Sequence, residues 1–180
     1  MVGKRLFWCI VCDGWRTRAR SVLLLGNSRR DASTALQFLT YTDEVTFLVD
    51  PDCAGRVAPV RPRLEAGGIR VLSGRVRRVQ ARPRARLSVA VDSGERLRVD
   101  YLFSLLGSSP RIAPLEHLPV ALSPVGYLRV DDHQRTSVPG LFAAGDVADG
   151  HSHQVATAVH EGATAAQAAN HALYPARQRI

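Results

Sequence analysis

An apolar run that ends in glycine restricts the fold of this chain more than any other feature. Residues 21–26 (SVLLLG) have the composition of a strand buried on both faces, as in a parallel sheet. Residues 31–40 then repeat apolar side chains on one helical face, and residues 45–49 (VTFLV) predict a second strand. Parallel strands need a long crossover between them, which is usually a helix. The order therefore predicts a βαβ unit and an α/β fold.

The pattern after this unit predicts further strands and one long helix. Residues 64–68 (LEAGG) indicate a helix end with a glycine cap, and a strand is predicted directly after it, at 69–72. Three alternating segments around the turn residues DSGE predict an antiparallel meander, namely 76–79, 87–91 and 97–102. The later sequence is rich in loops, and its predicted elements are a strand at 126–130, a strand and tight turn within 136–147, and a long helix over 154–173.

The net charge of +8 comes almost wholly from arginine, because Lys4 is the only lysine. The arginines between residues 56 and 98 are interleaved with prolines and aliphatic residues, whereas proteins that bind single-stranded nucleic acid use aromatic side chains for stacking. We therefore predict no nucleic-acid binding and interpret these arginines as a solvated basic face. Such a face attracts acidic proteins or anionic cofactors, since net charge governs encounter.

No segment of the sequence favours a membrane protein or an exported one. With 180 residues, of which 46% are hydrophobic, the chain can bury a core. No apolar run approaches the roughly 20 residues that span a bilayer, and the first residues lack the apolar stretch of a signal peptide. We expect a soluble, cytoplasmic protein that does not bind membranes.

Two cysteines separated by two residues, Cys9 and Cys12, form the clearest chemical motif. This spacing lets the sulfurs approach to bonding distance in a turn or first helical turn, and such motifs commonly favour a thiolate that attacks disulfides. Asp13 directly after them can shuttle the proton that the exchange requires. Half of a zinc site or two buried cysteines are the alternatives, but Cys53 is solitary and no second pair exists, so we predict no metal. We interpret three histidines near the start of the last predicted helix as solvated residues: His151, His153 and His160.

Two segments of the chain resemble the thioredoxin reductase family. Residues 7–15 (FWCIVCDGW), followed by a basic stretch and the βαβ unit, are similar to the redox-active segment of that family. Residues 136–147 (TSVPGLFAAGDV), followed by residues 154–157 (QVAT) and a helix of small residues, are similar to its C-terminal flavin-binding signature at the same spacing. The resemblance covers essentially the whole chain.

This resemblance implies an α/β architecture in three parts. A redox-active segment would occupy residues 1–15. A Rossmann-like nucleotide-binding domain, with a parallel sheet and an antiparallel meander, would occupy residues 16–105. The C-terminal part of a second, flavin-binding α/β domain would follow at residues 106–180.

The resemblance also implies an FAD-dependent oxidoreductase that passes electrons between NADPH or NADH, FAD, a Cys9–Cys12 disulfide and a substrate disulfide. One sulfur of the pair would exchange electrons with the flavin, the other would attack the substrate, and Asp13 would be the acid and base. The substrate would be a thioredoxin-like protein or a small disulfide, and the enzyme would be a homodimer.

The family's flavin contacts carry over to five residues of the later part of the sequence. The turn formed by Gly145, Asp146 and Val147 would lie against the flavin. Gly145 would allow close approach of the backbone, and Asp146 would bond the ribityl chain. The amides around Gln154 and Val155 would face the isoalloxazine ring at a helix N-terminus.

One departure from the family concerns the flavin site. The family carries the first half of its flavin domain, with the G-x-G-x-x-G turn that holds the diphosphate, ahead of the cysteine pair. In this sequence eight residues precede Cys9. Without the backbone amides of that turn, the flavin would lack its main anion site. We therefore expect tight FAD binding only if another polypeptide supplies this half.

A second departure concerns the nicotinamide site, where the family has a glycine-rich turn and this chain has the sequence GNSRRD. Gly26 is retained, but Ser28 and Asp31 stand where the family has glycine and a small residue. A side chain there obstructs the diphosphate or the contact between helix and strand, and a carboxylate repels phosphate. The sequence therefore predicts weakened nicotinamide binding.

Three further residues bear on the nicotinamide site. Arg29 and Arg30 can pair with phosphate, and Asp50 after the second strand can bond a ribose hydroxyl, which disfavours NADPH. An intact cysteine pair beside such a turn also resembles a branch of the family, the flavin-dependent dithiol oxidases and ferredoxin-linked reductases, which do not use NADPH. A non-catalytic relic that binds partners through its arginine-rich face is the remaining alternative.

Overall fold

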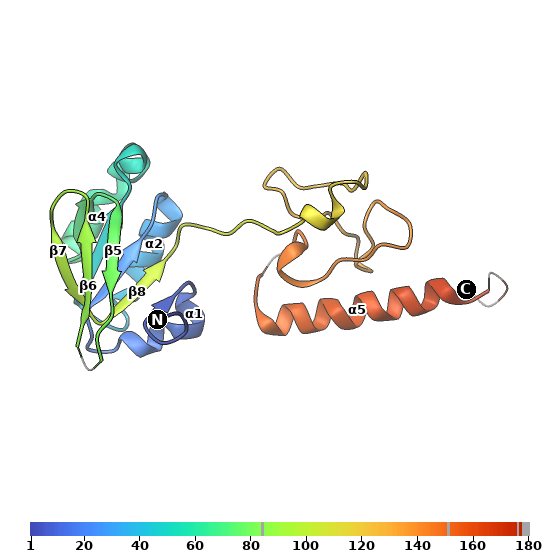
Figure 1. Cartoon of the computed structure of the whole chain (residues 1–180), viewed down its shortest axis with the longest axis horizontal. Helices are drawn as coiled ribbons and strands as arrows, with labels where there is room; N and C mark the ends of the chain where they lie inside the picture. The colour runs from blue at the N-terminus through green and yellow to red at the C-terminus, as the bar shows by residue number, and fades with distance from the viewer. Residues whose placement is uncertain (84, 151, 176, 178–180) are drawn as a thin grey trace. The chain divides into compact units, whose positions relative to one another are not determined.

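The computed structural model describes residues 1–83, 85–150, 152–175 and 177. The chain divides into two compact units, Met1–Gly107 (unit 1) and Ser108–Ile180 (unit 2), and each is described by itself (Figure 1). Within the described residues, no helix is long and apolar enough to cross a membrane.

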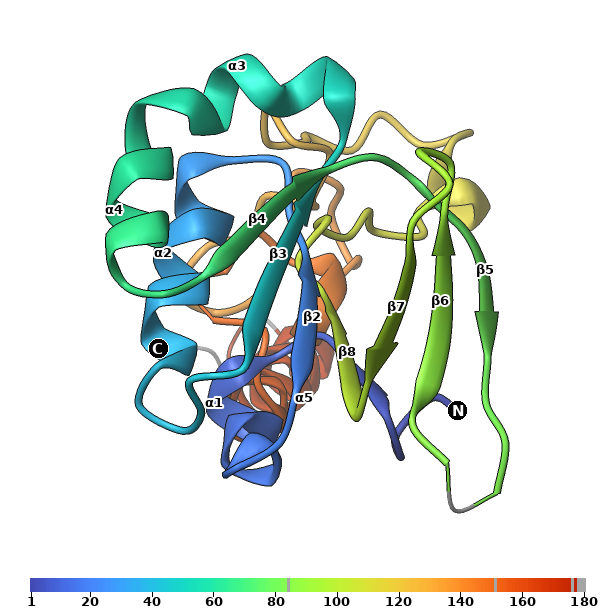
Figure 2. The ribbon, with the colours of Figure 1, turned by 90° about the vertical axis from the view of Figure 1, so that its left-hand side faces the viewer.

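Unit 1 is built on a five-stranded parallel sheet with the strand order β1-β8-β2-β3-β4. Its strands are β1 (Leu6–Phe7), β2 (Val22–Leu25), β3 (Val45–Val49), β4 (Arg70–Ser73) and β8 (Tyr101–Ser104). One face carries the helices α2 (Arg29–Phe38), α3 (Ala54–Val57) and α4 (Arg61–Ala66). Figure 2 shows an antiparallel meander on the other side, made of β5 (Val76–Gln80), β6 (Leu87–Val91) and β7 (Arg96–Val99). This is the predicted α/β fold with a parallel sheet and a meander.

Two buried clusters hold these layers together, one on each face of the sheet. Leu24 belongs to the cluster on the helix side, and Leu23, the next residue of β2, belongs to the cluster on the meander side. Because β2 is covered on both faces, the run Val22–Leu25 is apolar throughout instead of alternating. The predicted βαβ unit is confirmed, and α2 buries the predicted face through Ala32 and Ala35.

The third strand of the meander is confirmed, but its predicted extent to residue 102 is wrong, because the segment contains two strands in different sheets. β7 ends at Val99 and pairs with β6 in the meander, while β8 begins at Tyr101 and pairs with β2 in the parallel sheet. Asp100 lies between them and accepts hydrogen bonds from the backbone N and the Oγ of Ser21, at 3.1 and 2.9 Å. These bonds fix the chain where it crosses from one sheet to the other.

In the part of unit 2 that the structure describes, the chain forms one long helix, α5 (Val155–Leu173), as predicted, and two short 3-10 helices, Ala113–Leu115 and Gly145–Val147. The strands predicted at 126–130 and within 136–147 are wrong, since the described residues there form only isolated bridges, such as Leu128 with Ala148. The described residues of unit 2 include no sheet with which those segments could pair. Its described residues include four buried apolar side chains, Leu128, Ala143, Ala148 and Ala168, so unit 2 buries little core of its own.

Candidate functional site

The cysteine pair lies directly after β1, at the start of the short helix α1 (Ile10–Asp13). Cys9 is the N-cap residue of this helix, and its Sγ accepts a hydrogen bond from the backbone N of Cys12 at 3.2 Å. Cys9 is half-buried, whereas Cys12 is exposed. The pairing of β1 with β8 anchors the segment, since Phe7 stands opposite Phe103. The local structure thus holds the Cys9 sulfur as an acceptor, which suits a thiolate or a disulfide sulfur.

Arg16 fixes the carboxylate of Asp13, the predicted acid and base. Its Nε lies 2.8 Å from Oδ1 of Asp13. The guanidinium carbon of Arg16 lies 4.7 Å from the ring centre of Trp15 and 5.5 Å from that of Phe7, so two aromatic rings hold it in place. Arg16 was not among the residues predicted from the sequence, although its spacing of three residues from Asp13 in a helical turn was a usable signal.

The predicted nicotinamide turn is closed by its own side chains. Ser28 is the N-cap of α2, and its Oγ accepts a hydrogen bond from the backbone N of Asp31 at 3.2 Å. The carboxylate of Asp31 reaches back and accepts from the backbone N of Asn27 at 2.8 Å. Because these amides face side chains of the turn itself, they are not open to a diphosphate as they would be in a glycine-rich turn.

Gly26 has a packing role in this turn. A Cβ on Gly26 would lie 2.5 Å from the Cβ of Asp31 and 2.7 Å from the ring of Phe47, which is closer than such atoms approach. Arg29 and Arg30, the predicted phosphate partners, are exposed on the first turn of α2. Neither has an ion pair with a carboxylate among the described residues.

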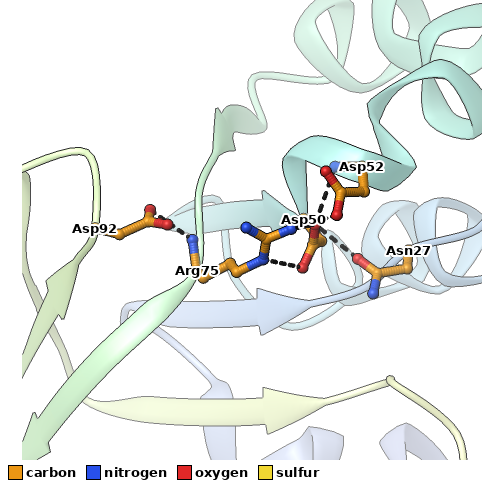
Figure 3. A network of polar contacts seen from close by, with 5 residues as sticks. All are labelled: Asn27, Asp50, Asp52, Arg75 and Asp92. Carbon is orange, nitrogen blue, oxygen red and sulfur yellow. Dashed lines mark hydrogen bonds and ion pairs between the residues drawn. The ribbon is translucent and has the colours of Figure 1, made fainter.

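Asp50, the predicted ribose ligand, is held by Arg75 at the end of β3 (Figure 3). Arg75 donates to both carboxylate oxygens of Asp50, at 2.7 and 2.8 Å, and to Oδ2 of Asp52 at 2.5 Å. The backbone N of Arg75 donates to Asp92, and Oδ1 of Asn27 accepts from the backbone N of Asp50 at 3.0 Å. The structure therefore joins the turn after β2 and the end of β3 to the start of β5. Arg75 was not predicted from the sequence, because it lies far from Asp50 along the chain.

Asn27, Asp50 and Arg75 line a cleft of about 260 Å³ near the carboxyl ends of β2 and β3. Its other walls are apolar or glycine, and the lining comprises Leu25, Asn27, Leu48, Asp50, Gly74, Arg75, Val76 and Leu106. Open α/β sheets bind ligands at this edge. In this chain the acidic residue at that edge is already engaged by a bidentate arginine.

Removing Arg75 is expected to change the titration of Asp50. The hydrogen bonds from Arg75 hold the pKa of the Asp50 carboxyl below its ordinary value of 3.8. A lowered pKa contributes stability above the ordinary value, and that contribution is lost as the pH falls through the lowered one. We expect Arg75→Ala to return the pKa of Asp50 toward 3.8, so that the carboxyl protonates at higher pH. Carbon-detected NMR titration of the carboxyl checks this. Arg77→Ala, two residues further on in β5, is the control, and an unchanged Asp50 titration in Arg75→Ala would contradict the assignment.

The predicted flavin turn in unit 2 is tied to α5 by a buried glutamate. Gly145 has φ of +75°, and its backbone N donates to Oε2 of Glu161 at 2.7 Å. Glu161 is only 8% exposed, whereas the predicted ribityl ligand Asp146 is exposed. Glu161 is another functional candidate that was not predicted from the sequence, although it is the one acidic residue in the sequence of α5.

The other predicted flavin contacts stand at the start of α5. Gln154 is its N-cap residue, and Val155 begins the helix with an 82% exposed side chain. Val147 closes the 3-10 helix that starts at Gly145. The left-handed backbone of Gly145 requires a residue without a side chain, and a Cβ there would meet the Cβ of Ala158 at 3.4 Å. A backbone turn and a helix N-terminus therefore lie together in unit 2, at the residues predicted to contact the flavin.

The structure describes two of the three histidines that were interpreted as solvated residues. His153 and His160 are described, and the ring of His153 lies 5.0 Å from that of Tyr127. His151 lies outside the described residues. In the described part of the chain, no group of three or more His, Cys, Asp or Glu side chains could hold a metal ion.

Comparisons with known proteins give one consistent match. The profile of the family described as pyridine nucleotide-disulphide oxidoreductase matches residues 34–162. Thioredoxin reductase of Treponema pallidum (strain Nichols) is 31% identical over 174 residues, which cover 93% of this chain and 56% of that protein. The chain spans about half the length of the curated relatives that it matches.

Solved structures agree with this match. Thioredoxin reductase from Streptococcus pyogenes MGAS5005 has the same fold, with a TM-score of 0.77 at 24% identity over 94% of this chain and 57% of that one. The atypical thioredoxin reductase TRi from Desulfovibrio vulgaris Hildenborough is 31% identical with a TM-score of 0.51, over 94% of this chain and 56% of that one.

Proposed function

Because this chain belongs to the pyridine nucleotide-disulphide oxidoreductase family, we propose that it carries the dithiol centre of a flavin-dependent disulfide oxidoreductase of the thioredoxin reductase type. The observation that carries the proposal is the Cys9 sulfur at the start of α1, which accepts from the backbone N of an exposed Cys12. The arrangement suits a pair that alternates between dithiol and disulfide.

In the proposed exchange, one thiolate of the pair attacks a substrate disulfide and one substrate sulfur leaves. The second cysteine then displaces the other substrate sulfur from the mixed disulfide. The pair becomes a Cys9–Cys12 disulfide, and the substrate receives two electrons and two protons as two thiols. Asp13, held by Arg16, moves a proton to or from the reacting sulfur.

FAD, when bound, would supply or accept the two electrons that connect this pair to the donor. Gly145 and Asp146 would hold it from one side, with the N-terminus of α5 at Gln154 and Val155 facing its ring system. The first half of the flavin site would come from another segment or polypeptide. The low buried content of unit 2 supports this, since such a unit gains stability when its exposed apolar side chains are covered. Val155, Val159 and Leu173 of α5 are among those side chains.

The proposal includes a thioredoxin-like protein or a small disulfide as substrate, a homodimer as the assembly and the cytoplasm as the location. The names of the relatives support the substrate class. NADPH or NADH would be the electron donor in the simplest version.

A second version, without a nicotinamide donor, is favoured by the turn at residues 26–31. The side chains of Ser28 and Asp31 accept hydrogen bonds from the backbone amides that a diphosphate would need. Arg75 likewise binds the carboxylate of Asp50, the predicted ribose ligand. This version corresponds to a flavin-dependent dithiol oxidase or a ferredoxin-linked reductase. Calorimetric titration of the full chain with NADPH and with NADH distinguishes the versions. We expect no saturable binding at nicotinamide concentrations below about 1 mM. A dissociation constant of that size corresponds to a binding free energy of only roughly −4 kcal/mol. Binding in the micromolar range would restore nicotinamide as the donor.

The dithiol centre itself is tested by equilibrating the full chain with glutathione redox buffers. Alkylation and mass spectrometry then measure the fraction of chains that carry the disulfide between Cys9 and Cys12 at each buffer potential. We expect one two-electron transition in the range of thioredoxin-type pairs, roughly −180 to −300 mV. The same transition in Cys53→Ala is the control. A pair that forms only mixed disulfides with glutathione would contradict the proposed function.

A further inference from the structure

The outward face of the meander forms a basic trough. In β6 the outward residues are small, Ser88 and Ala90, while Leu87, Val89 and Val91 are buried against the parallel sheet. The strand register places Ala90 between Arg78 of β5 and Arg96 of β7, and Ser88 between Gln80 and Arg98. Long side chains on the outer strands and small ones on the central strand produce a channel along β6.

This channel is continuous with the hairpin that joins β5 to β6, and it encloses about 530 Å³. We call it the meander trough, and its lining comprises Gln80, Arg82, Ala85, Arg86, Ser88, Arg96 and Arg98. Arg86 pairs with Asp100 at 3.6 Å. Within the described residues, Arg82, Arg96 and Arg98 have no Asp or Glu oxygen within 4.0 Å. The trough therefore presents positive charge that the described part of the chain does not neutralise.

We propose that the meander trough binds an extended acidic segment of a partner protein. Alternate residues of a strand lie about 7 Å apart, so Arg96 and Arg98 match the spacing of alternate acidic side chains in an extended chain. The outer strands β5 and β7 lie two strand spacings apart, roughly 10 Å, which admits one extended backbone. Guanidinium groups bind carboxylates through two parallel hydrogen bonds, which adds geometric selectivity to the charge attraction.

The chemistry of the trough favours a polypeptide over a nucleic acid. Sheets that bind single-stranded nucleic acid stack the bases on aromatic side chains of the strands. The sequences of β5, β6 and β7 (VRRVQ, LSVAV and RLRV) contain no Phe, Tyr or Trp. Ser88 and Ala90 on the floor leave room for a peptide backbone but provide no stacking surface.

Anisotropy of a fluorescein-labelled octaglutamate peptide, titrated with the full chain at low salt, tests this proposal. We expect saturable binding that weakens as salt is added, because exposed charge pairs are screened. Arg96→Glu with Arg98→Glu should weaken the binding by at least about tenfold, since two ion pairs are lost and two repulsions are introduced. The double variant Arg56→Glu with Arg63→Glu changes the net charge equally on exposed positions of α3 and α4, and should change the affinity by less than about twofold.

A milder pair, Arg96→Gln with Arg98→Gln, keeps the test valid if the charge reversal disturbs folding, and far-UV circular dichroism monitors both. Equal loss of affinity in the trough variant and the control variant would overturn the proposal, because net charge alone would then explain binding. Tighter binding of octauridylate than of octaglutamate would also overturn it, in favour of a nucleic-acid surface.

Discussion

A Cys12→Ser variant is expected to lose disulfide reduction by about a thousandfold or more in any flavin-loaded assembly of the chain. The physical reason is that the remaining cysteine can attack a substrate disulfide but cannot resolve the mixed disulfide that results. Resolution of a mixed disulfide by the second cysteine of the pair is intramolecular, because Cys9 and Cys12 share the first turn of α1, where the backbone N of Cys12 lies 3.2 Å from the sulfur of Cys9. An external thiol must replace it at a much lower effective concentration.

The missing resolution step can be measured on the full chain without flavin. The reduced protein is mixed with an aromatic disulfide that releases a coloured thiol. The parent chain should release two equivalents from Cys9 and Cys12 in a fast phase, and Cys12→Ser should release one and remain as a mixed disulfide. Cys53→Ala keeps the pair intact and should behave as the parent does in the fast phase. Two fast equivalents from Cys12→Ser would remove this pair from the mechanism.

A Gly26→Ala variant should destabilise unit 1 by about 2–3 kcal/mol, because overpacking a buried contact has costs of this size. The added methyl group would meet the Cβ of Asp31 and the ring of Phe47, neither of which can rotate away as a flexible chain end would. Phe47 is fully buried in the cluster on the helix side of the sheet. The N-terminus of α2 would have to move away from β2 and β3.

Urea denaturation followed by tryptophan fluorescence measures this effect on unit 1 alone, since both tryptophans, Trp8 and Trp15, belong to that unit. Gly55→Ala is the matched control, because nothing lies within 4 Å of its added Cβ and its site is helical. We expect that control to be neutral or to stabilise by about 0.5–1 kcal/mol. Equal midpoints for the two variants would show that the contact at Gly26 relaxes freely.

The parts of unit 1 that depend on local periodicity could be predicted from the sequence. The strand at 22–25, the helix at 29–38 and the strand at 45–49 each bury the side chains that their patterns place inward. The break at Asp100 could not, because apolar residues recur on both sides of it and only its bonds to Ser21 show where the sheets divide. The missing strands of unit 2 have a related cause. A strand needs a neighbour, and no local pattern tells whether one is present.

The candidate site divides in the same way. Cys9, Cys12 and Asp13 are adjacent in the sequence, so their chemistry could be predicted from spacing alone. Arg75 lies between β4 and β5, and it contacts Asp50 only because the folded chain brings this connection next to the end of β3. That contact could not be predicted without the fold. Glu161 lies on a helix that consists mostly of small residues, and nothing in this pattern marks it as a buried acceptor. Its hydrogen bond to the backbone N of Gly145 depends on how the turn packs against the helix.

The pairing of β1 with β8 also sets the order in which the dithiol becomes structured. β1 has only two residues, Leu6 and Phe7, and its partner strand is the last one of unit 1. Closing such a contact has a large loop entropy cost, which the intervening structure must offset first. During synthesis, Cys9 and Cys12 therefore leave the ribosome early and gain their fixed positions late. Cys53 emerges in that interval, so until β8 has been made the fold cannot exclude a wrong disulfide between Cys53 and either Cys9 or Cys12.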